Sequence, residues 1–230
     1  MGNLIMKYIL LTEKSWHINL FKELKGHLQG EWTLINEKSD FTEENVSRIK
    51  PNIIFIPHWS YLIPPNIFQN YECIVFHMTN LPFGRGGSPL QNLIEMGFKE
   101  TKISAIKVES KIDSGDIYLK KKLILDGTAR EIFDRASVII KSMIQEIIQN
   151  KPTPIPQEGE PFFFKRRTLA DSEISKLQDL EKIYDFIRML DCEGYPNAFI
   201  ETEKFKYEFS NASFNSDDKI VLANVRISKK

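Results

Sequence analysis

The chain has 230 residues, of which 42% are hydrophobic and 27% are charged, a composition typical of globular proteins. Thirty-one basic side chains balance thirty-one acidic ones, so the basic excess of most nucleic-acid-binding proteins is missing and we expect no nucleic-acid partner. No apolar run approaches the length of a membrane span, so we expect no membrane partner either.

Cysteine and histidine usage points to the cytoplasm and away from a metal site. The two cysteines, Cys73 and Cys192, are too few for a disulfide framework and lack metal-binding spacing, which favours a reducing, cytoplasmic location. The four histidines also lack the spacing of zinc ligands, so no metal is expected. They are His17, His27, His58 and His77.

Strands and helices alternate through the first 150 residues. Apolar runs predict strands at residues 7–11, 32–35, 52–57, 73–76, 103–108 and 117–125. Apolar residues at helical spacing predict helices at residues 16–28 and 42–49, after Ser88, and after Thr128. This alternation predicts an α/β fold with a Rossmann-like, doubly wound, mostly parallel sheet.

Two of these helices have clear start signals. Ser88 is a favoured N-cap residue, Pro89 suits the first helical position, and Gln91 would complete a capping box with Ser88. Thr128 and Glu131 have the same spacing before the long amphipathic helix.

A change in composition divides the chain after residue 150. Residues 151–161 hold four prolines, which predicts an extended linker or a segment that crosses the chain. Beyond it, one helical pattern and two or three alternating stretches predict a small α+β subdomain. We therefore expect a catalytic domain at 1–150, a Pro-rich linker at 151–161 and a C-terminal subdomain at 162–230.

Polar residues follow three of the predicted strands, where ligands bind in open α/β sheets. His77 comes directly after one apolar run, and Asp113 lies in the loop after another. A histidine at a strand end is more often structural than catalytic, and Asp-Ser-Gly is also ordinary turn chemistry. The glycines after His77 match neither the P-loop nor the dinucleotide pattern, so a tight turn explains them best.

Three segments, in this order, resemble the folate-dependent formyltransferase family and its methionyl-tRNA-formyltransferase-like catalytic domain. They are "WSYLIPPNIF", "HMTNLPFGRGGSPL" and "KIDSGD", and the resemblance covers roughly residues 5–150. The middle segment looks most similar to family members that formylate amino sugars of the pseudaminic or nonulosonic acid type.

The resemblance implies transfer of a formyl group from 10-formyltetrahydrofolate to a primary amine. His77 would donate a hydrogen bond to the developing oxyanion and handle the proton, and Asp113 would orient it. Two loops would line the cofactor pocket. Their residues are Tyr61, Leu62 and Ile63 on one side and Glu109, Lys111 and Ile112 on the other.

One residue departs from the family pattern. The family commonly has Asn two residues before the histidine, and this chain has Val75, which cannot donate a hydrogen bond. Asn80, His58 or a backbone amide would then take that role, and we include Asn80 among the candidate catalytic residues. The alternative is a non-catalytic homologue that binds folate or sugar.

The resemblance further predicts the acceptor. A neutral C-terminal segment fits a small-molecule amino sugar or nucleotide sugar, in surface glycan biosynthesis, better than a tRNA. Arg85, Arg166 and Arg167 would bind the substrate, because guanidinium groups bind phosphate well, although a solvated turn explains the last two equally well. An aminoacyl acceptor is the alternative. A homodimer built by the C-terminal strands is left open.

Overall fold

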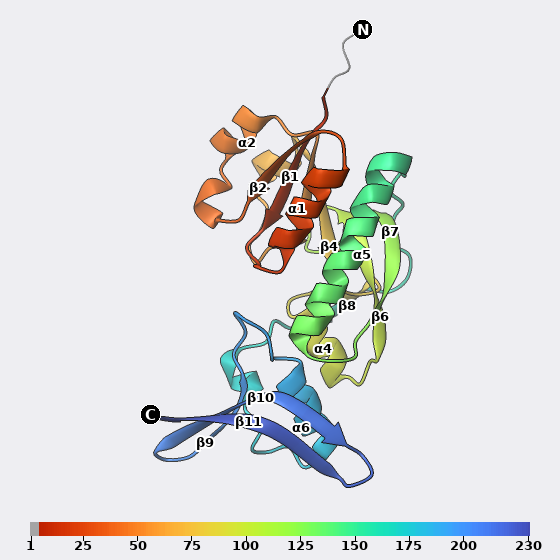
Figure 1. Cartoon of the computed structure of the whole chain (residues 1–230). Helices are drawn as coiled ribbons and strands as arrows, with labels where there is room; N and C mark the ends of the chain where they lie inside the picture. The colour runs from red at the N-terminus through yellow and green to blue at the C-terminus, as the bar shows by residue number, and fades with distance from the viewer. Residues whose placement is uncertain (1–4) are drawn as a thin grey trace. The chain divides into compact units, whose positions relative to one another are not determined.

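The computed structural model describes residues 5–230, which form two compact units with interleaved sequence (Figure 1). Unit 1 contains the residues up to Arg85, Lys102–Leu123 and Asp134–Phe163. Unit 2 contains Gly86–Thr101, Ile124–Phe133 and Phe164–Lys230. The division into 1–150, 151–161 and 162–230 stays a prediction, because the contacts within the chain group its residues differently.

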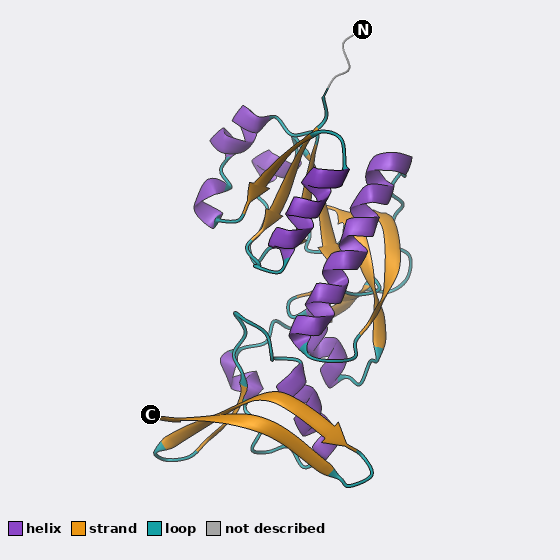
Figure 2. Ribbon diagram, viewed as in Figure 1, coloured by secondary structure: helices purple, strands orange, loops and turns teal. Residues whose placement is uncertain are grey.

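A six-stranded sheet is the core of the larger unit (Figure 2). Its strand order is β2-β1-β3-β4-β6-β7. The pairings β1–β2, β1–β3 and β3–β4 are parallel, which confirms the predicted mixed α/β fold with a mostly parallel sheet. The strands are β1 (Lys7–Thr12), β2 (Glu31–Ile35), β3 (Ile53–His58), β4 (Glu72–His77), β6 (Glu100–Lys107) and β7 (Ile117–Ile124). Two short strands, β5 (Phe83–Gly86) and β8 (Phe162–Phe164), pair separately.

Helices cover both faces of this sheet, which explains why its central strands are almost wholly apolar. On one face, Val46 and Ile67 pack into a buried cluster with the strand residue Ile54. On the other face, α1 and α5 lie side by side, joined by an ion pair between Glu23 and Lys141 (Figure 1). The helices are α1 (His17–His27), α2 (Glu43–Ile49), α3 (Pro65–Phe68), α4 (Pro89–Glu95), α5 (Ala129–Asn150) and α6 (Leu180–Arg188).

The strand β6 departs from the expected geometry because it runs antiparallel to β4. Lys107, the last residue of β6, pairs with Ile74, which precedes His77 by three residues in β4. The loop after β6 therefore leaves the opposite edge of the sheet, and the prediction that it follows a carboxyl end shared with β4 was wrong. Apolar runs look alike in parallel and antiparallel central strands, so the sequence pattern did not reveal this direction.

Unit 2 contains the predicted C-terminal α+β structure. Its sheet has three antiparallel strands in the order β11-β10-β9, and α6 packs against β10. The strands are β9 (Ala198–Glu201), β10 (Phe205–Asn215) and β11 (Ile220–Lys229). A 3₁₀ turn at Leu169–Ser172 also belongs to unit 2, and another at Lys38–Asp40 belongs to unit 1.

The start of α4 corrects the predicted capping box. Ser88 has a left-handed backbone, with φ of 53°, and its side chain makes no capping bond. Instead, its hydroxyl accepts a hydrogen bond from the backbone of Arg167 at 3.1 Å, and Gln91 donates to the carbonyl of Met189 at 3.1 Å. Both side chains thus bind segments far away in the sequence. The second predicted box, Thr128 with Glu131, is confirmed, since each side chain accepts from the other's backbone.

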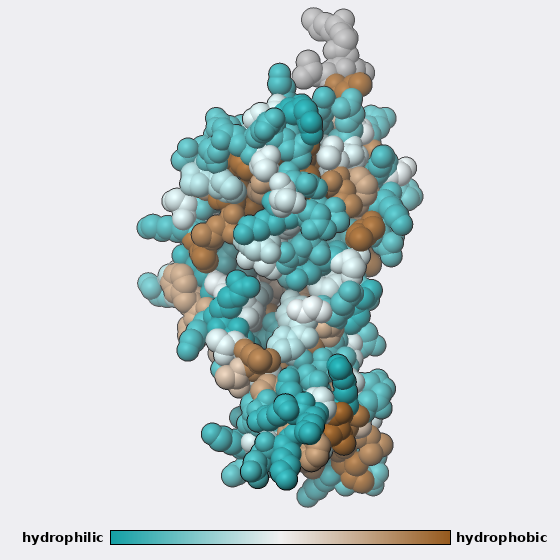
Figure 3. All heavy atoms as spheres, turned by 90° about the vertical axis from the view of Figure 1, so that its left-hand side faces the viewer, coloured by the Kyte–Doolittle hydropathy of each residue, from teal (hydrophilic) through white to brown (hydrophobic). Residues whose placement is uncertain are grey.

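The surface shown in Figure 3 is mostly hydrophilic, with hydrophobic side chains in separate patches. Across residues 5–230, none of the helices combines the length and apolar character that crossing a bilayer requires.

Candidate active site around His77 and Asp113

His77 ends strand β4 and is buried, with 8% of its surface exposed. Its Nε2 lies 2.7 Å from the carbonyl oxygen of Gly84, which also accepts a hydrogen bond from the Thr79 hydroxyl at 3.3 Å. A carbonyl oxygen can only accept, so Nε2 carries the hydrogen and Nδ1 is the nitrogen free to exchange a proton. The histidine loop, residues 77–87, therefore folds back on its own imidazole and fixes the ring.

Asp113 faces the other side of the same ring. Its Oδ2 lies 3.6 Å from Nδ1 of His77, which is longer than a direct hydrogen bond but close enough for a strong electrostatic effect. The carboxylate therefore faces the nitrogen that would gain a proton if the ring acted as a base. The structure thus brings together the two residues that the sequence singled out.

The loop that carries Asp113, residues 109–116, is called the acid loop below, and it brings the Asp113 carboxylate to His77. Asp113 has a φ of 50°, a left-handed conformation that is uncommon for residues other than glycine. At Gly115, an added Cβ would lie 1.8 Å from the carbonyl oxygen of Lys107, so only glycine allows this close approach. The Lys107 amide also donates to the Asp116 carbonyl at 2.9 Å, which anchors the loop's far end.

Val75 fills an apolar position on the strand that ends at His77. It packs against Leu81, Ile106 and Ile117, so the position where the family commonly has Asn belongs to the core here. Asn80 is exposed, and its side-chain oxygen accepts from Lys120 at 2.9 Å. That Asn80 takes over the role of the family's asparagine stays a prediction.

The predicted cofactor-side residues lie mostly at the surface. Tyr61, Leu62 and Ile112 are exposed, at 43%, 77% and 52%, whereas Ile63 packs against the buried core. Large apolar side chains left exposed in two loops fit the flat faces of an aromatic ligand such as a pterin ring, which would cover them. Glu109 and Lys111 are also exposed. The binding roles of these six residues stay predictions.

The three predicted substrate-binding arginines have different surroundings. Arg85 is half-buried, donates twice to Gln157 and lies 5.9 Å from the ring of Phe163. Arg166 is exposed.

Arg167 has an ion pair with Glu95 and packs 5.1 Å over the ring of Phe186. Only 10% of its side chain is exposed, so packing occupies this guanidinium, and Arg166 is the more accessible of the two residues. Their roles in substrate binding stay predictions.

Sequence reasoning missed Gln157, which lies in the Pro-rich segment. Its amide contacts both the acid loop and Arg85, so it connects parts of the candidate site that are distant in the sequence. A single glutamine between prolines has no local signature, and only an expectation that the segment packs against the catalytic loops would have drawn attention to it.

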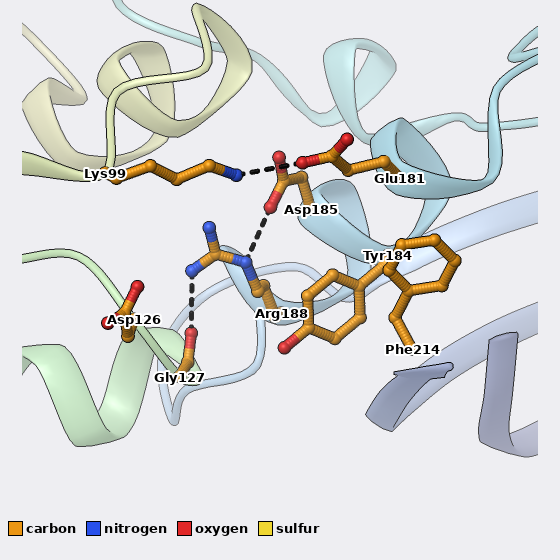
Figure 4. Close-up of a pocket in the computed structure, with 8 residues that line it drawn as sticks. All are labelled: Lys99, Asp126, Gly127, Glu181, Tyr184, Asp185, Arg188 and Phe214. Carbon is orange, nitrogen blue, oxygen red and sulfur yellow. Dashed lines mark hydrogen bonds and ion pairs between the residues drawn. The ribbon is translucent and has the colours of Figure 1, made fainter. Parts of the chain in front are cut away.

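A pocket of about 280 Å³ in unit 2 contains none of the predicted site residues (Figure 4). Arg188 donates to Asp185 at 2.6 Å and to the Gly127 carbonyl at 2.8 Å, and Lys99 pairs with Glu181 at 3.0 Å. Because these charges neutralise one another, the pocket has the character of a structural ion-pair cluster. Among residues 5–230, no three His, Cys, Asp or Glu side chains are grouped to bind a metal.

Comparison with known proteins identifies the family. Residues 18–145 match the family model described as formyl transferase, and residues 169–228 match the one described as the C-terminal domain of methionyl-tRNA formyltransferase. The chain belongs to the formyl transferase family. This is a family of formyl-transfer enzymes whose donor is 10-formyltetrahydrofolate, so both expectations are confirmed for the family.

The relatives correct the predicted acceptor. Methionyl-tRNA formyltransferase of Wolbachia pipientis subsp. Culex pipiens is 25% identical over 84% of this chain, and the chain spans 66% of that relative. The solved structure of methionyl-tRNA formyltransferase from Clostridium thermocellum is 52% identical, covers 98% of this chain and 100% of its own, and has a TM-score of 0.95.

By contrast, a 4-N formyltransferase from Francisella tularensis is 16% identical over 86% of this chain and 93% of its own. Its TM-score is 0.65, so it shares the fold alone. The predictions of an amino-sugar acceptor and of no nucleic-acid partner were therefore wrong. They relied on the neutral overall charge and the short C-terminal segment, yet that segment matches a domain of methionyl-tRNA formyltransferase.

Proposed function

We propose that this chain transfers a formyl group from 10-formyltetrahydrofolate to the α-amine of an aminoacyl acceptor, namely methionyl-tRNA. The observation that carries the proposal is the 52% identity to a methionyl-tRNA formyltransferase along essentially the full length of both chains. The setting would be the cytoplasm, where aminoacyl-tRNA is made.

The geometry supports a division of labour between His77 and Asp113. The folate donor supplies the formyl group. Nδ1 of His77 accepts the proton that the acceptor amine loses as it forms its new bond to carbon, while Nε2 stays bonded to the Gly84 carbonyl. The Asp113 carboxylate, 3.6 Å away, stabilises the imidazolium that results. Proton return to the departing nitrogen of the donor then restores the neutral ring.

Charge distribution suggests how an RNA-linked acceptor would bind. Residues 164–230 carry equal numbers of basic and acidic side chains, so this segment offers few uncompensated contacts to phosphates. We infer that the chain recognises mainly the aminoacyl end of the acceptor. Formylation should then fall only modestly between 50 and 200 mM salt, because few counterions are released on binding.

The test is to incubate the protein with 10-formyltetrahydrofolate and methionyl-tRNA, and to measure tetrahydrofolate release together with formyl-methionine on the RNA. Uncharged tRNA, free methionine and amino sugars serve as comparison acceptors. We expect transfer to methionyl-tRNA alone, and transfer about 10²- to 10⁴-fold slower in a His77→Ala variant. Transfer to another amine but not to methionyl-tRNA would contradict the proposed acceptor. Folate binding without turnover on any amine would favour the non-catalytic alternative that Val75 suggests.

A further inference from the structure

The Pro-rich segment contacts both loops that carry the candidate catalytic pair. Ile155 exchanges two backbone hydrogen bonds with Ile117, at 2.7 and 3.0 Å, directly after the acid loop. Further along, the Phe162 amide donates to the Pro82 carbonyl at 3.2 Å, and its ring stacks on Phe83, in the histidine loop, at 5.0 Å. We call residues 155–162 the strap, because one end is fixed beside each loop. The segment is thus a packed part of unit 1.

Gln157 lies between the two fixed ends of the strap and uses both ends of its amide. Its Nε2 donates to the carbonyl oxygens of Asp113 and Gly115, each at 2.9 Å. Its Oε1 accepts from Nε and Nη2 of Arg85, at 3.1 and 2.7 Å. The positive charge of Arg85 strengthens those two bonds and fixes which way the amide points. The nitrogen is thereby directed at the acid loop.

We propose that Gln157 is a positioning residue for formyl transfer, which holds the acid loop so that the Asp113 carboxylate stays beside His77. The backbone of Asp113 is left-handed, and such a conformation persists only where the surroundings hold it in place. One of the two bonds from Gln157 goes to the carbonyl of Asp113 itself. The inference rests on the proposed formyl transfer, although not on the identity of the acceptor.

Two substitutions distinguish the hydrogen bonds that Gln157 makes with the acid loop from those that it makes with Arg85. Gln157→Met keeps the length of the side chain and removes all four hydrogen bonds. Gln157→Glu keeps an acceptor for Arg85 but places a carboxylate oxygen against the two carbonyls of the acid loop, where a donor is needed. Both variants should therefore release the acid loop, although only one loses the contact with Arg85.

We expect kcat to fall about tenfold to a hundredfold in both variants, since misplacing a catalytic group by about 1 Å has effects of this size. KM for the formyl donor should change less than kcat, because Ile112 moves with the acid loop whereas the predicted donor-side residues Tyr61, Leu62 and Ile63 lie outside it. The ¹⁵N signals of the His77 ring should move in both variants, because the carboxylate that faces Nδ1 moves. A merely structural role for Gln157 would leave those ring signals unchanged.

The matched control is Glu158→Ala, which changes an exposed neighbour in the same strap. It should keep the kcat and the ring signals of the unaltered chain. Wild-type kcat in Gln157→Glu, equal losses in Glu158→Ala, or unmoved His77 signals would each overturn the proposal. The NMR signals of the His77 ring can be measured without any acceptor substrate. An unaltered protein that fails to formylate methionyl-tRNA would thus contradict the proposed function, while the NMR comparison would still decide the role of Gln157.

Discussion

His58 and His77 end the neighbouring parallel strands β3 and β4, yet their imidazoles have different environments. The ring of His58 lies 5.7 Å from Trp16 and 6.4 Å from His17, and burial, with a further effect of Lys14, lowers its pKa to about 3. His77 is bonded to a carbonyl and faces a carboxylate. A histidine that ends a strand is therefore a catalytic candidate only where its partners favour proton exchange.

Removing each imidazole in turn tests most directly whether His77 and His58 differ in function. His77→Ala should lower kcat about 10²- to 10⁴-fold, the usual contribution of a general acid–base group. His58→Gln should change kcat less than about tenfold, because a ring with a pKa near 3 stays neutral at the pH of the assay. Steady-state formylation assays on both variants, with circular dichroism to verify folding, make the test. Equal losses in the two variants would refute the distinction.

Removing only the carboxylate should have a smaller effect. Asp113→Asn keeps the size of the side chain but loses the charge that stabilises the imidazolium of His77, 3.6 Å away. We expect kcat to fall about tenfold to a hundredfold, because two charges at this range interact by about 4 kcal/mol at most in a protein surface environment, and solvent screens part of that. If kcat stays unchanged, Asp113 is only a turn residue.

The buried histidines should instead affect stability at low pH. The pKa of His17 is lowered to about 3 by burial and by His58, and its Nδ1 lies 3.0 Å from the Ser137 hydroxyl. Between pH 6.5 and 3 the unfolded chain binds protons at His17 and His58 that the folded chain does not bind. Stability therefore falls as the pH drops through this window, by up to about 1.4 kcal/mol per pH unit for each histidine.

Urea unfolding of the parent and of His17→Gln at pH 7, 6, 5 and 4 measures this loss. The variant keeps a hydrogen-bonding side chain but lacks one titrating ring, so its stability should decline less steeply than that of the parent. Parallel curves would show that carboxylates alone account for the acid sensitivity.

Local patterns in the sequence predicted the sheet well because its strands are continuous apolar runs. Ile54, Phe55 and Ile56 are all buried, as expected for a central strand covered on both faces. The same logic placed His77 at a strand end. It failed at Ser88, because the hydroxyl expected to cap α4 is used by the backbone of Arg167, 79 positions away. Capping rules consider only neighbours in the chain, so they cannot register such a competitor.

The meeting of His77 with Asp113 was predicted from the family resemblance rather than from geometry. The acid loop follows an antiparallel strand, so the rule about carboxyl ends of parallel strands did not apply to it. Gln157 was not predictable at all, because proline content marks an extended segment without saying what that segment packs against. Long-range hydrogen bonds of single side chains thus form the part of the site that sequence patterns omit.

The smallest expected effect concerns Asn80. Its side-chain oxygen is bonded to Lys120, whose ammonium also donates to the Leu81 carbonyl at 2.5 Å, and burial lowers the pKa of that ammonium. Removing an exposed amide that is bonded to a lysine should cost little activity, so Asn80→Ala should lower kcat less than about threefold. Removing an essential oxyanion donor would lower kcat a hundredfold or more. A formylation assay distinguishes these two losses of kcat. A loss of a hundredfold or more would assign to Asn80 the role of the amide that Val75 replaces, whereas a small loss leaves that role to His58 or a backbone amide.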